Sequence, residues 1–136
     1  MNKNTVAYIY VDDIAKGKNY TFLDSREPKE FNVSHLKNAV NIGYDKFDSK
    51  KFVKDFPNKN ENIVVYCSIG IRSETIGDKL KKLGYKNVQN LYGGIFEWKN
   101  KGNKVVDKDN LETEKIHTFD KNWSKYLKKG EKVYEK

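Results

Sequence analysis

The sequence predicts an α/β protein in which helices cover both faces of a five-stranded parallel sheet. Short apolar runs, rich in β-branched and aromatic residues, alternate along the chain with segments whose apolar residues recur at helical spacing. The chain has 136 residues, the size of one ordinary domain, and nine Tyr and seven Phe supply bulky residues for its core. We therefore expect one domain and one continuous sheet.

Five runs are predicted strands, and all are short and apolar, as strands buried in a parallel sheet are. The run Asn-Ile-Val-Val-Tyr is the most apolar of them and is expected to be the most buried. In chain order the predicted strands are residues 7–10, 20–24, 38–42, 62–66 and 87–92.

Between these runs the sequence indicates turns and helices. Residues 11–18 form a turn or a short helix, and Pro28 suits the first turn of a helix over 28–33. Ser49 is a candidate N-cap for a helix over 50–56, which ends before a proline.

A longer helix follows the fourth strand, because Ile76, Leu80 and Leu83 recur at helical spacing and Gly84 supplies a left-handed stop. After the fifth strand, residues 93–102 are expected to turn and form a short helix that docks an isoleucine and a tryptophan on the core.

The C-terminal part differs in character, and we divide the chain into a domain over 5–105 and an extension over 106–136. In the extension Phe119, Trp123, Tyr126 and Leu127 would fall on one face of a helix. Such a stripe favours a helical extension that packs on the domain. A helix that docks a partner protein is the alternative.

Charge and cysteine content narrow the function. The net charge of +8 attracts anions, but the lysines are spread along the chain, so the sequence predicts a small anionic substrate and no nucleic-acid partner. A single cysteine excludes an internal disulfide, a CxxC redox pair and a cysteine zinc site. His35 and His117 do not resemble a metal cluster, and we expect neither a metal nor a cofactor.

The start of the chain lacks the apolar core of a secretory signal, and no run approaches membrane-spanning length. With one unpaired thiol, the expectation is a cytoplasmic protein that has no membrane partner. A secreted or periplasmic protein whose signal was removed would look the same.

The segment Val-Tyr-Cys-Ser-Ile-Gly-Ile-Arg-Ser, residues 65–73, places the lone Cys67 between the fourth strand and the following helix. Ligands bind at this end of the strands in open α/β sheets. The backbone N–H groups of residues 68–73 are unpaired donors that could surround the sulfur and favour a nucleophilic thiolate. The expected contributors are Ser68, Ile69, Gly70, Ile71, Arg72 and Ser73. Gly70 would supply the turn, Arg72 a fork for an oxyanion, and Ser73 a helix cap or a donor to a bound anion.

These residues, with three other segments, resemble a single rhodanese domain over roughly residues 5–105. The resemblance rests on Asp24, Arg26 and Glu27 after the second strand, Ser34-His35-Leu36 with Ala39, the Cys67 loop, and Gly93-Gly94 with Trp98. Ser34 and Asn38 depart from it, because the family usually has glycine at both positions. The extension resembles one found on some bacterial single-domain members.

The resemblance implies a thiosulfate sulfurtransferase in which Cys67 carries a sulfane sulfur as a persulfide. Thiosulfate or a small persulfide would donate the sulfur, and a thiol or cyanide would accept it. Arg72 and the loop residues would bind the donor, whereas Asp24 and Arg26 are expected in an ion-pair network near the rim of the pocket, where Arg26 could contact substrate.

Two other functions stay open. Phosphatases and arsenate reductases also use a cysteine in a strand-to-helix loop, but their signature has one residue more between cysteine and arginine. The four residues here make a ring suited to one sulfur atom and too small for phosphate. A non-catalytic sulfur carrier or protein-interaction module is the second alternative, because a fold alone does not determine a function.

Overall fold

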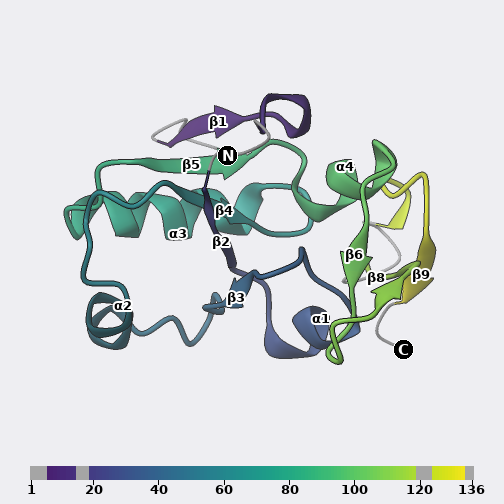
Figure 1. Cartoon of the computed structure of the whole chain (residues 1–136), viewed down its shortest axis with the longest axis horizontal. Coiled ribbons are helices and arrows are strands. Elements are labelled where there is room, and N and C mark those ends of the chain that lie inside the picture. The colour runs from purple at the N-terminus through teal and green to yellow at the C-terminus, as the bar shows by residue number, and fades with distance from the viewer. Residues whose placement is uncertain (1–5, 15–18, 119–123, 134–136) are drawn as a thin grey trace.

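The computed structural model describes residues 6–14, 19–118 and 124–133, and its centre is one parallel sheet (Figure 1). All neighbouring strands run parallel, in the order β1-β5-β4-β2-β3. This confirms the predicted five-stranded parallel sheet. Its strands are β1 (Ala7–Ile9), β2 (Thr21–Asp24), β3 (Val40–Asn41), β4 (Ile63–Tyr66) and β5 (Val88–Leu91).

The central strand β4 shows why the sequence forms a buried sheet. All four of its residues are buried, and successive side chains point to opposite faces. Ile63 and Val65 belong to the core cluster covered by α2 (Ser49–Asp55) and α3 (Ile71–Lys82). Val64 and Tyr66 belong to the other cluster, on the face of α4 (Gly94–Asn100). Figure 1 shows α2 and α3 to the left of α1 and α4.

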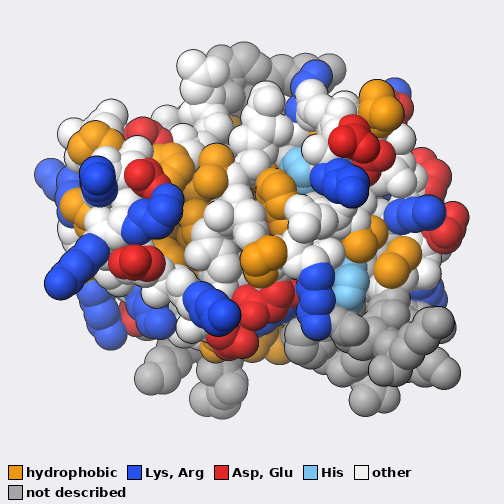
Figure 2. All heavy atoms as spheres, turned by 90° about the horizontal axis from the view of Figure 1, so that it is seen from below, with side chains coloured by type: hydrophobic (Ala, Val, Ile, Leu, Met, Phe, Trp, Pro, Cys, Tyr) orange, Lys and Arg blue, Asp and Glu red, His pale blue; other side chains and the backbone are white. Residues whose placement is uncertain are grey.

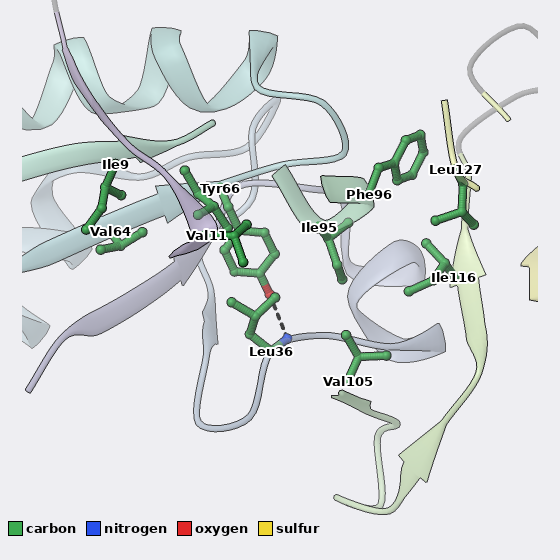
Figure 3. Packing of buried hydrophobic residues seen from close by; sticks show 11 residues of the cluster. Ile9, Val11, Leu36, Val64, Tyr66, Ile95, Phe96, Val105, Ile116 and Leu127 are labelled. Atoms are coloured by element: carbon green, nitrogen blue, oxygen red, sulfur yellow. Dashed lines mark hydrogen bonds between the residues drawn. The ribbon is translucent and has the colours of Figure 1, made fainter. Parts of the chain in front are cut away.

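The second cluster contains a polar anchor. The Tyr66 hydroxyl, fully buried, accepts a hydrogen bond of 3.1 Å from the backbone N–H of Leu36 (Figure 3). Burial raises the pKa of this phenol well above its ordinary value, so it stays neutral in the core. The contact fixes the connection between α1 (Pro28–Val33) and β3 against the end of the central strand.

Two helix starts differ from the prediction. The N-cap of α2 is Asp48, not Ser49, because the Asp48 carboxylate accepts from the N–H groups of Lys50 and Lys51. Helix α3 begins at Ile71, earlier than its apolar spacing indicated, and its N-cap Gly70 has a left-handed backbone. The predicted turn over 11–18 contains the 3-10 helix η1 (Val11–Asp13), and residues 15–18 lie outside the described part.

The described part of the extension contains short strands, which the sequence analysis did not predict, in place of a helix along its length. Two antiparallel strands start it and two parallel strands follow, with Ile116 and Leu127 buried in the second core cluster. Phe119 and Trp123 of the predicted helix lie outside the described residues. The strands are β6 (Val105–Val106), β7 (Glu112–Thr113), β8 (Lys115–His117) and β9 (Glu131–Val133).

The face of the molecule seen from below in Figure 2 carries Lys and Arg side chains interspersed with Asp and Glu, without a block of one sign. None of the described helices has the length and apolar character needed to cross a bilayer. Nor do the described residues include a group of three or more His, Cys, Asp or Glu that could hold a metal ion.

The buried position of Leu127 gives a test of how the extension contributes to stability. Leu127 is 2% exposed, whereas its neighbour Tyr126 is 49% exposed. We expect Leu127→Ala to lower the free energy of unfolding by about 2–4 kcal/mol, because a buried cavity replaces packed atoms. The matched variant Tyr126→Ala should cost less than about 0.5 kcal/mol in urea denaturation. Equal effects of the two substitutions would contradict this packing.

Candidate active site

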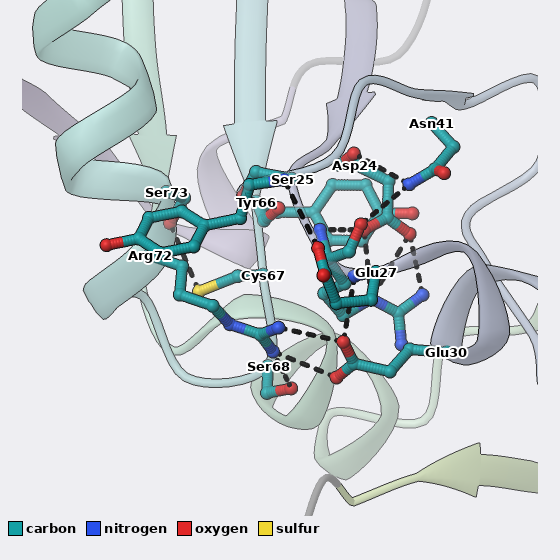
Figure 4. Close-up of polar contacts among 12 residues, drawn as sticks. Asp24, Ser25, Glu27, Glu30, Asn41, Tyr66, Cys67, Ser68, Arg72 and Ser73 are labelled. Atoms are coloured by element: carbon teal, nitrogen blue, oxygen red, sulfur yellow. Dashed lines mark hydrogen bonds and ion pairs between the residues drawn. The ribbon is translucent and has the colours of Figure 1, made fainter. Parts of the chain in front are cut away.

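Cys67 follows the buried strand β4 directly, at the carboxyl edge of the sheet, and has no exposed surface. Its environment is not purely apolar. The N–H of Gly70 donates to the Sγ atom over 3.1 Å. The Ser73 hydroxyl lies 3.4 Å from the same atom (Figure 4). The loop therefore points one backbone donor and one hydroxyl at the sulfur.

Fewer groups contact the sulfur than the predicted ring of backbone amides would supply. Among the described residues, the hydrogen bonds to the Cys67 sulfur come from Gly70 and Ser73 alone. Helix α3 begins at Ile71, and the amides of its first turn, which have no partner within the helix, make no hydrogen bond to the sulfur. Gly70, at φ +115°, makes the turn that a side chain would disfavour.

Backbone hydrogen bonds from the start of α4 hold the loop in place. The N–H of Ile95 donates to the carbonyl of Cys67 over 2.9 Å, and that of Phe96 donates to the carbonyl of Ser68 over 3.2 Å. A Cβ atom on Gly94 would collide with these two carbonyl oxygens. Gly94 thus lets the backbone of α4 approach the loop closely. The loop carbonyls are bound by N–H groups at the start of α4 that have no partner within the helix.

The guanidinium group of Arg72 is not exposed to solvent for binding a ligand. Its guanidinium donates to both carboxylate oxygens of Glu30, over 2.8 and 2.9 Å, and to the Ser68 hydroxyl over 3.0 Å (Figure 4). Arg72 is 8% exposed and Glu30 fully buried. The guanidinium group, which was predicted to bind an oxyanion, therefore binds Glu30 and links the loop to α1. The charge on Arg72 is balanced inside the protein.

The ionisation of this pair follows from its burial and contacts. Burial by itself disfavours both charges, but the hydrogen bonds and charge of Arg72 outweigh it and lower the pKa of Glu30 below 4.5. The pKa of Arg72 is raised: burial acts to lower it, whereas Glu30 and, more weakly, the charge of Cys67 raise it. Both groups are thus charged at neutral pH.

Asn90 of β5 is a site residue that the sequence analysis missed. It is fully buried, and its Oδ1 accepts from the Ser73 hydroxyl over 2.6 Å. Its Nδ2 donates to the Gly70 carbonyl over 3.1 Å and to a Glu74 carboxylate oxygen over 3.3 Å. One amide thus positions both groups that contact the sulfur. No local signal singles out Asn90, because the predicted strand over 87–92 also contains Asn87 and Gln89.

Asp24 and Arg26 lie in the interior, not at a pocket rim, since neither has exposed surface. Arg26 binds the Asp24 carboxylate through Nε and Nη2, with a shortest distance of 2.6 Å, and donates to the carbonyl of Ser34 over 2.7 Å. The ion-pair interpretation of these two residues therefore agrees with the contacts, and the rim position does not.

The two positions where the family usually has glycine show what the replacements do. Asn38 has φ +68°, a left-handed conformation that asparagine tolerates better than most residues. The Ser34 hydroxyl is buried and has no hydrogen-bond partner among the described residues. His35 packs locally: its Nδ1 lies 2.9 Å from the Phe31 carbonyl oxygen, and its ring stacks on that of Phe31 with 3.7 Å between the ring centroids.

The exposed side of the loop consists of its two isoleucines. Ile71 is 57% exposed and Ile69 is half-buried, whereas Ser68 and Ser73 are fully buried. Thus the polar side chains of the loop face inward, toward the sulfur and the Glu30 pair. The predicted loop residues are all brought together around Cys67, but only Gly70 and Ser73 contact its sulfur.

Residues 9–101 match the family described as the rhodanese-like domain. The chain belongs to this family. A provisionally assigned mitochondrial thiosulfate sulfurtransferase of Schizosaccharomyces pombe is 36% identical over 94 residues, which cover 62% of this chain and 66% of that protein. A tRNA uridine(34) hydroxylase of Hamiltonella defensa is 31% identical over 130 residues, covering 92% of this chain and 34% of that protein.

A solved structure supports the same rhodanese-like fold. The rhodanese-related protein of Thermoplasma volcanium is 30% identical, with a TM-score of 0.64 over 74% of this chain and 97% of that one. The chain spans less than two thirds of the length of the curated relatives that it matches. Their names also differ in activity, so what they share with this chain is the domain.

The contact between Gly94 and the loop can be tested with a matched pair of glycines. Both Gly94 and Gly102 have positive φ, but a Cβ on Gly102 would meet nothing within 4 Å. We expect Gly94→Ala to destabilise the protein more than Gly102→Ala, which pays only the backbone cost of about 1–2 kcal/mol. Iodoacetamide should also alkylate Cys67 faster in Gly94→Ala, because the loop is displaced. Equal stability and equal alkylation rates would contradict the close contact.

The Glu30–Arg72 pair predicts a pH dependence of stability. A carboxyl whose pKa is lower in the folded than in the unfolded protein stabilises the fold above its unfolded value and loses that effect as pH falls through its folded value. At pH 7, Glu30→Gln should cost about 3 kcal/mol, because it leaves a buried charge unpaired. The difference from the unsubstituted protein should shrink as the pH falls below 4.5. Urea denaturation at several pH values measures it, with the exposed Glu131→Gln as the variant that should show no difference.

Proposed function

We propose that this rhodanese-like protein is a sulfurtransferase that carries a sulfane sulfur on Cys67, with thiosulfate or a small persulfide as donor. The observation that supports this most directly is the Gly70 N–H aimed at the Cys67 sulfur over 3.1 Å, with the Ser73 hydroxyl beside it. The Gly70 N–H is in place before reaction and favours negative charge at that sulfur, whereas the proton of the Ser73 hydroxyl is directed at Asn90. Membership of the rhodanese-like family agrees with this chemistry.

The reaction has two displacements. The Cys67 thiolate attacks the outer sulfur of thiosulfate, the sulfur–sulfur bond of the donor breaks, and sulfite leaves with the electron pair. An acceptor thiolate or cyanide then attacks the outer sulfur of the Cys67 persulfide, and Cys67 returns as a thiolate. This is covalent catalysis of the ping-pong type, and no second cysteine is needed.

Because Cys67 has no exposed surface, the substrate that donates sulfur reaches the Cys67 thiol only when the loop opens. The loop is short and its outer side consists of Ile69 and Ile71. Its fixed points are the contacts with α4 and the Arg72–Glu30 pair. We therefore propose that residues 69–71 shift outward while Ser68, held by Phe96 and Arg72, stays in place.

The contacts of Arg72 favour sulfur transfer over phosphate hydrolysis. A cysteine phosphatase needs its arginine to bind the substrate oxyanion. Here the guanidinium group of Arg72 is hydrogen-bonded to Glu30 and Ser68 instead. The role left for Arg72 is to position the loop and to place a positive charge near Cys67. A sulfur carrier that does not turn over remains the alternative that the experiment must separate.

The test is the intact mass of the protein after incubation with thiosulfate and, separately, with a small-molecule persulfide. We expect the mass to rise by one sulfur atom, to return on addition of cyanide, and to stay constant in Cys67→Ser. Loading followed by repeated turnover supports the enzyme, and loading without turnover would make the protein a carrier.

Two results would overturn the proposal. One is the absence of loading from either donor while the thiol reacts with iodoacetamide only in the unfolded protein, since Cys67 would then be a buried structural residue. The other is hydrolysis of an aryl phosphate that Cys67→Ser abolishes.

A further inference from the structure

A cleft lies beside the Cys67 loop, and no step of the proposed reaction has used it. Its volume is about 310 Å³, which suits a small ligand. Gly70 lines the cleft and also donates to the Cys67 sulfur, so one residue separates the cleft from the reacting atom. The lining residues are Tyr8, Ile69, Gly70, Ile71, Tyr92, Gly93, Phe96, Glu97, Asn100 and Tyr126.

Aromatic rings form much of this cleft. Tyr8 and Tyr92 pack edge to face, with ring centroids 5.4 Å apart and planes at 88°. Tyr92 and Tyr126 are 47% and 49% exposed, a large fraction for aromatic side chains. Lys125 Nζ lies 5.3 Å from the centroid of the Tyr126 ring, so a lysine of the protein itself already lies over one face of this ring.

Tyr126 belongs to the C-terminal extension, and its place at the cleft is fixed. The Asn100 side chain donates to the Tyr126 carbonyl over 3.0 Å and accepts from the N–H groups of Lys128 and Lys129. The next residue, Leu127, is buried in the core. The extension thus contributes one wall of a cleft whose other walls come from the rhodanese-like domain.

The residues that line the cleft carry a negative charge in a protein that is positive overall, although Lys125 lies beside the lining residue Tyr126. One residue in five is Lys or Arg and the net charge is +8, yet the lining residues include a carboxylate, Glu97, and neither Lys nor Arg. The Glu97 carboxylate makes no hydrogen bond or ion pair in the part of the chain that the structure describes. A neighbouring hollow, which Glu97 and Tyr92 also line, adds Asp12 and Asp13, with Lys101 bound to Asp12.

We propose that this cleft binds the sulfur acceptor and selects a small thiol that carries a positively charged ammonium group. The proposal rests on the sulfur-transfer function proposed above. Tyrosine faces with a carboxylate attract a cation and disfavour an anion, so this surface does not suit thiosulfate. With its ammonium group near Glu97 and the tyrosines, the acceptor can extend its sulfur along Gly70 toward Cys67.

The transfer step needs no further reactant. The acceptor thiolate attacks the outer sulfur of the Cys67 persulfide and forms a new sulfur–sulfur bond, while the bond to Cys67 breaks. The electron pair of that bond returns to Cys67 as a thiolate, and the acceptor leaves as a persulfide. The number of electrons and the total charge are unchanged.

The test uses protein that is first loaded with one sulfur, confirmed by intact mass, and then mixed with one of three thiols. The thiols are thiocholine, which is cationic, 2-mercaptoethanol, which is neutral, and 3-mercaptopropionate, which is anionic. The loss of the added sulfur gives a second-order rate constant for each thiol. Because the thiols differ in intrinsic reactivity, the measured quantity is the ratio of two thiols in a variant, relative to the same ratio in the unsubstituted protein.

In Glu97→Gln and in Tyr126→Ala we expect the ratio of thiocholine to 2-mercaptoethanol to fall about fivefold, the size of a cation–carboxylate or cation–aromatic contact at a half-exposed site. In Glu97→Gln the ratio of 3-mercaptopropionate to 2-mercaptoethanol should rise. Tyr126→Phe should keep the thiocholine ratio, because the ring and not its hydroxyl faces the cation. Glu131→Gln removes an exposed carboxylate that does not line the cleft and should change no ratio.

Unchanged ratios in Glu97→Gln and Tyr126→Ala, in protein that loads normally, would overturn this inference and leave the sulfurtransferase proposal standing. An equal fall for Glu131→Gln would also overturn it, since the preference would then come from overall charge. Failure of the loading step itself would instead refute the proposed function on which the inference rests.

Discussion

The buried ion pair between Arg72 and Glu30 is the contact on which the geometry of the Cys67 loop depends. It joins the first turn of α3 to α1, two elements that are far apart in the sequence, through two hydrogen bonds of nearly equal length. Burying both charges is costly, and the bidentate geometry with the Ser68 hydroxyl offsets that cost. The pair therefore contributes more to the position of the loop than to overall stability, and the hydrogen bond to the sulfur comes from the Gly70 backbone N–H.

Around this pair the carboxyl edge of the sheet is polar, whereas its two faces are apolar. Asp24, Arg26 and Asn90 are all fully buried, and their polar groups bind one another or loop carbonyls. Such groups are costly when unpaired, so each fixes the position of its partner. The Ser34 hydroxyl and Nη1 of Arg26 are exceptions, because neither has a hydrogen-bond partner among the described residues. The loop is thus positioned by directional contacts, and the sheet beneath it by packing.

Much of this could be predicted from local patterns, and the remainder depends on contacts between distant residues. The apolar run before Cys67, the helical spacing of Ile76 and Leu80, and the left-handed Gly84 are local signals, and the structure bears them out. Glu30 and Asn90 carry no local signal for their roles, because their partners lie 42 and 17 residues away. The cap of α2 shows the same limit, since Asp48 and Ser49 are both good caps and only the backbone path selects one.

The extension links stability to the surface beside the loop. Leu127 contributes to the core together with Phe96, and Phe96 belongs to α4, whose first N–H groups hold the carbonyls of Cys67 and Ser68. Lys99, on the same helix, binds Glu114 of the extension over 2.8 Å. Because one short helix contacts the loop at its start and the extension along its length, the two are parts of one packed unit. A change in the extension therefore acts on the cleft directly at Tyr126 and on the Cys67 loop through α4, whereas the Arg72–Glu30 pair holds the loop independently from the side of α1.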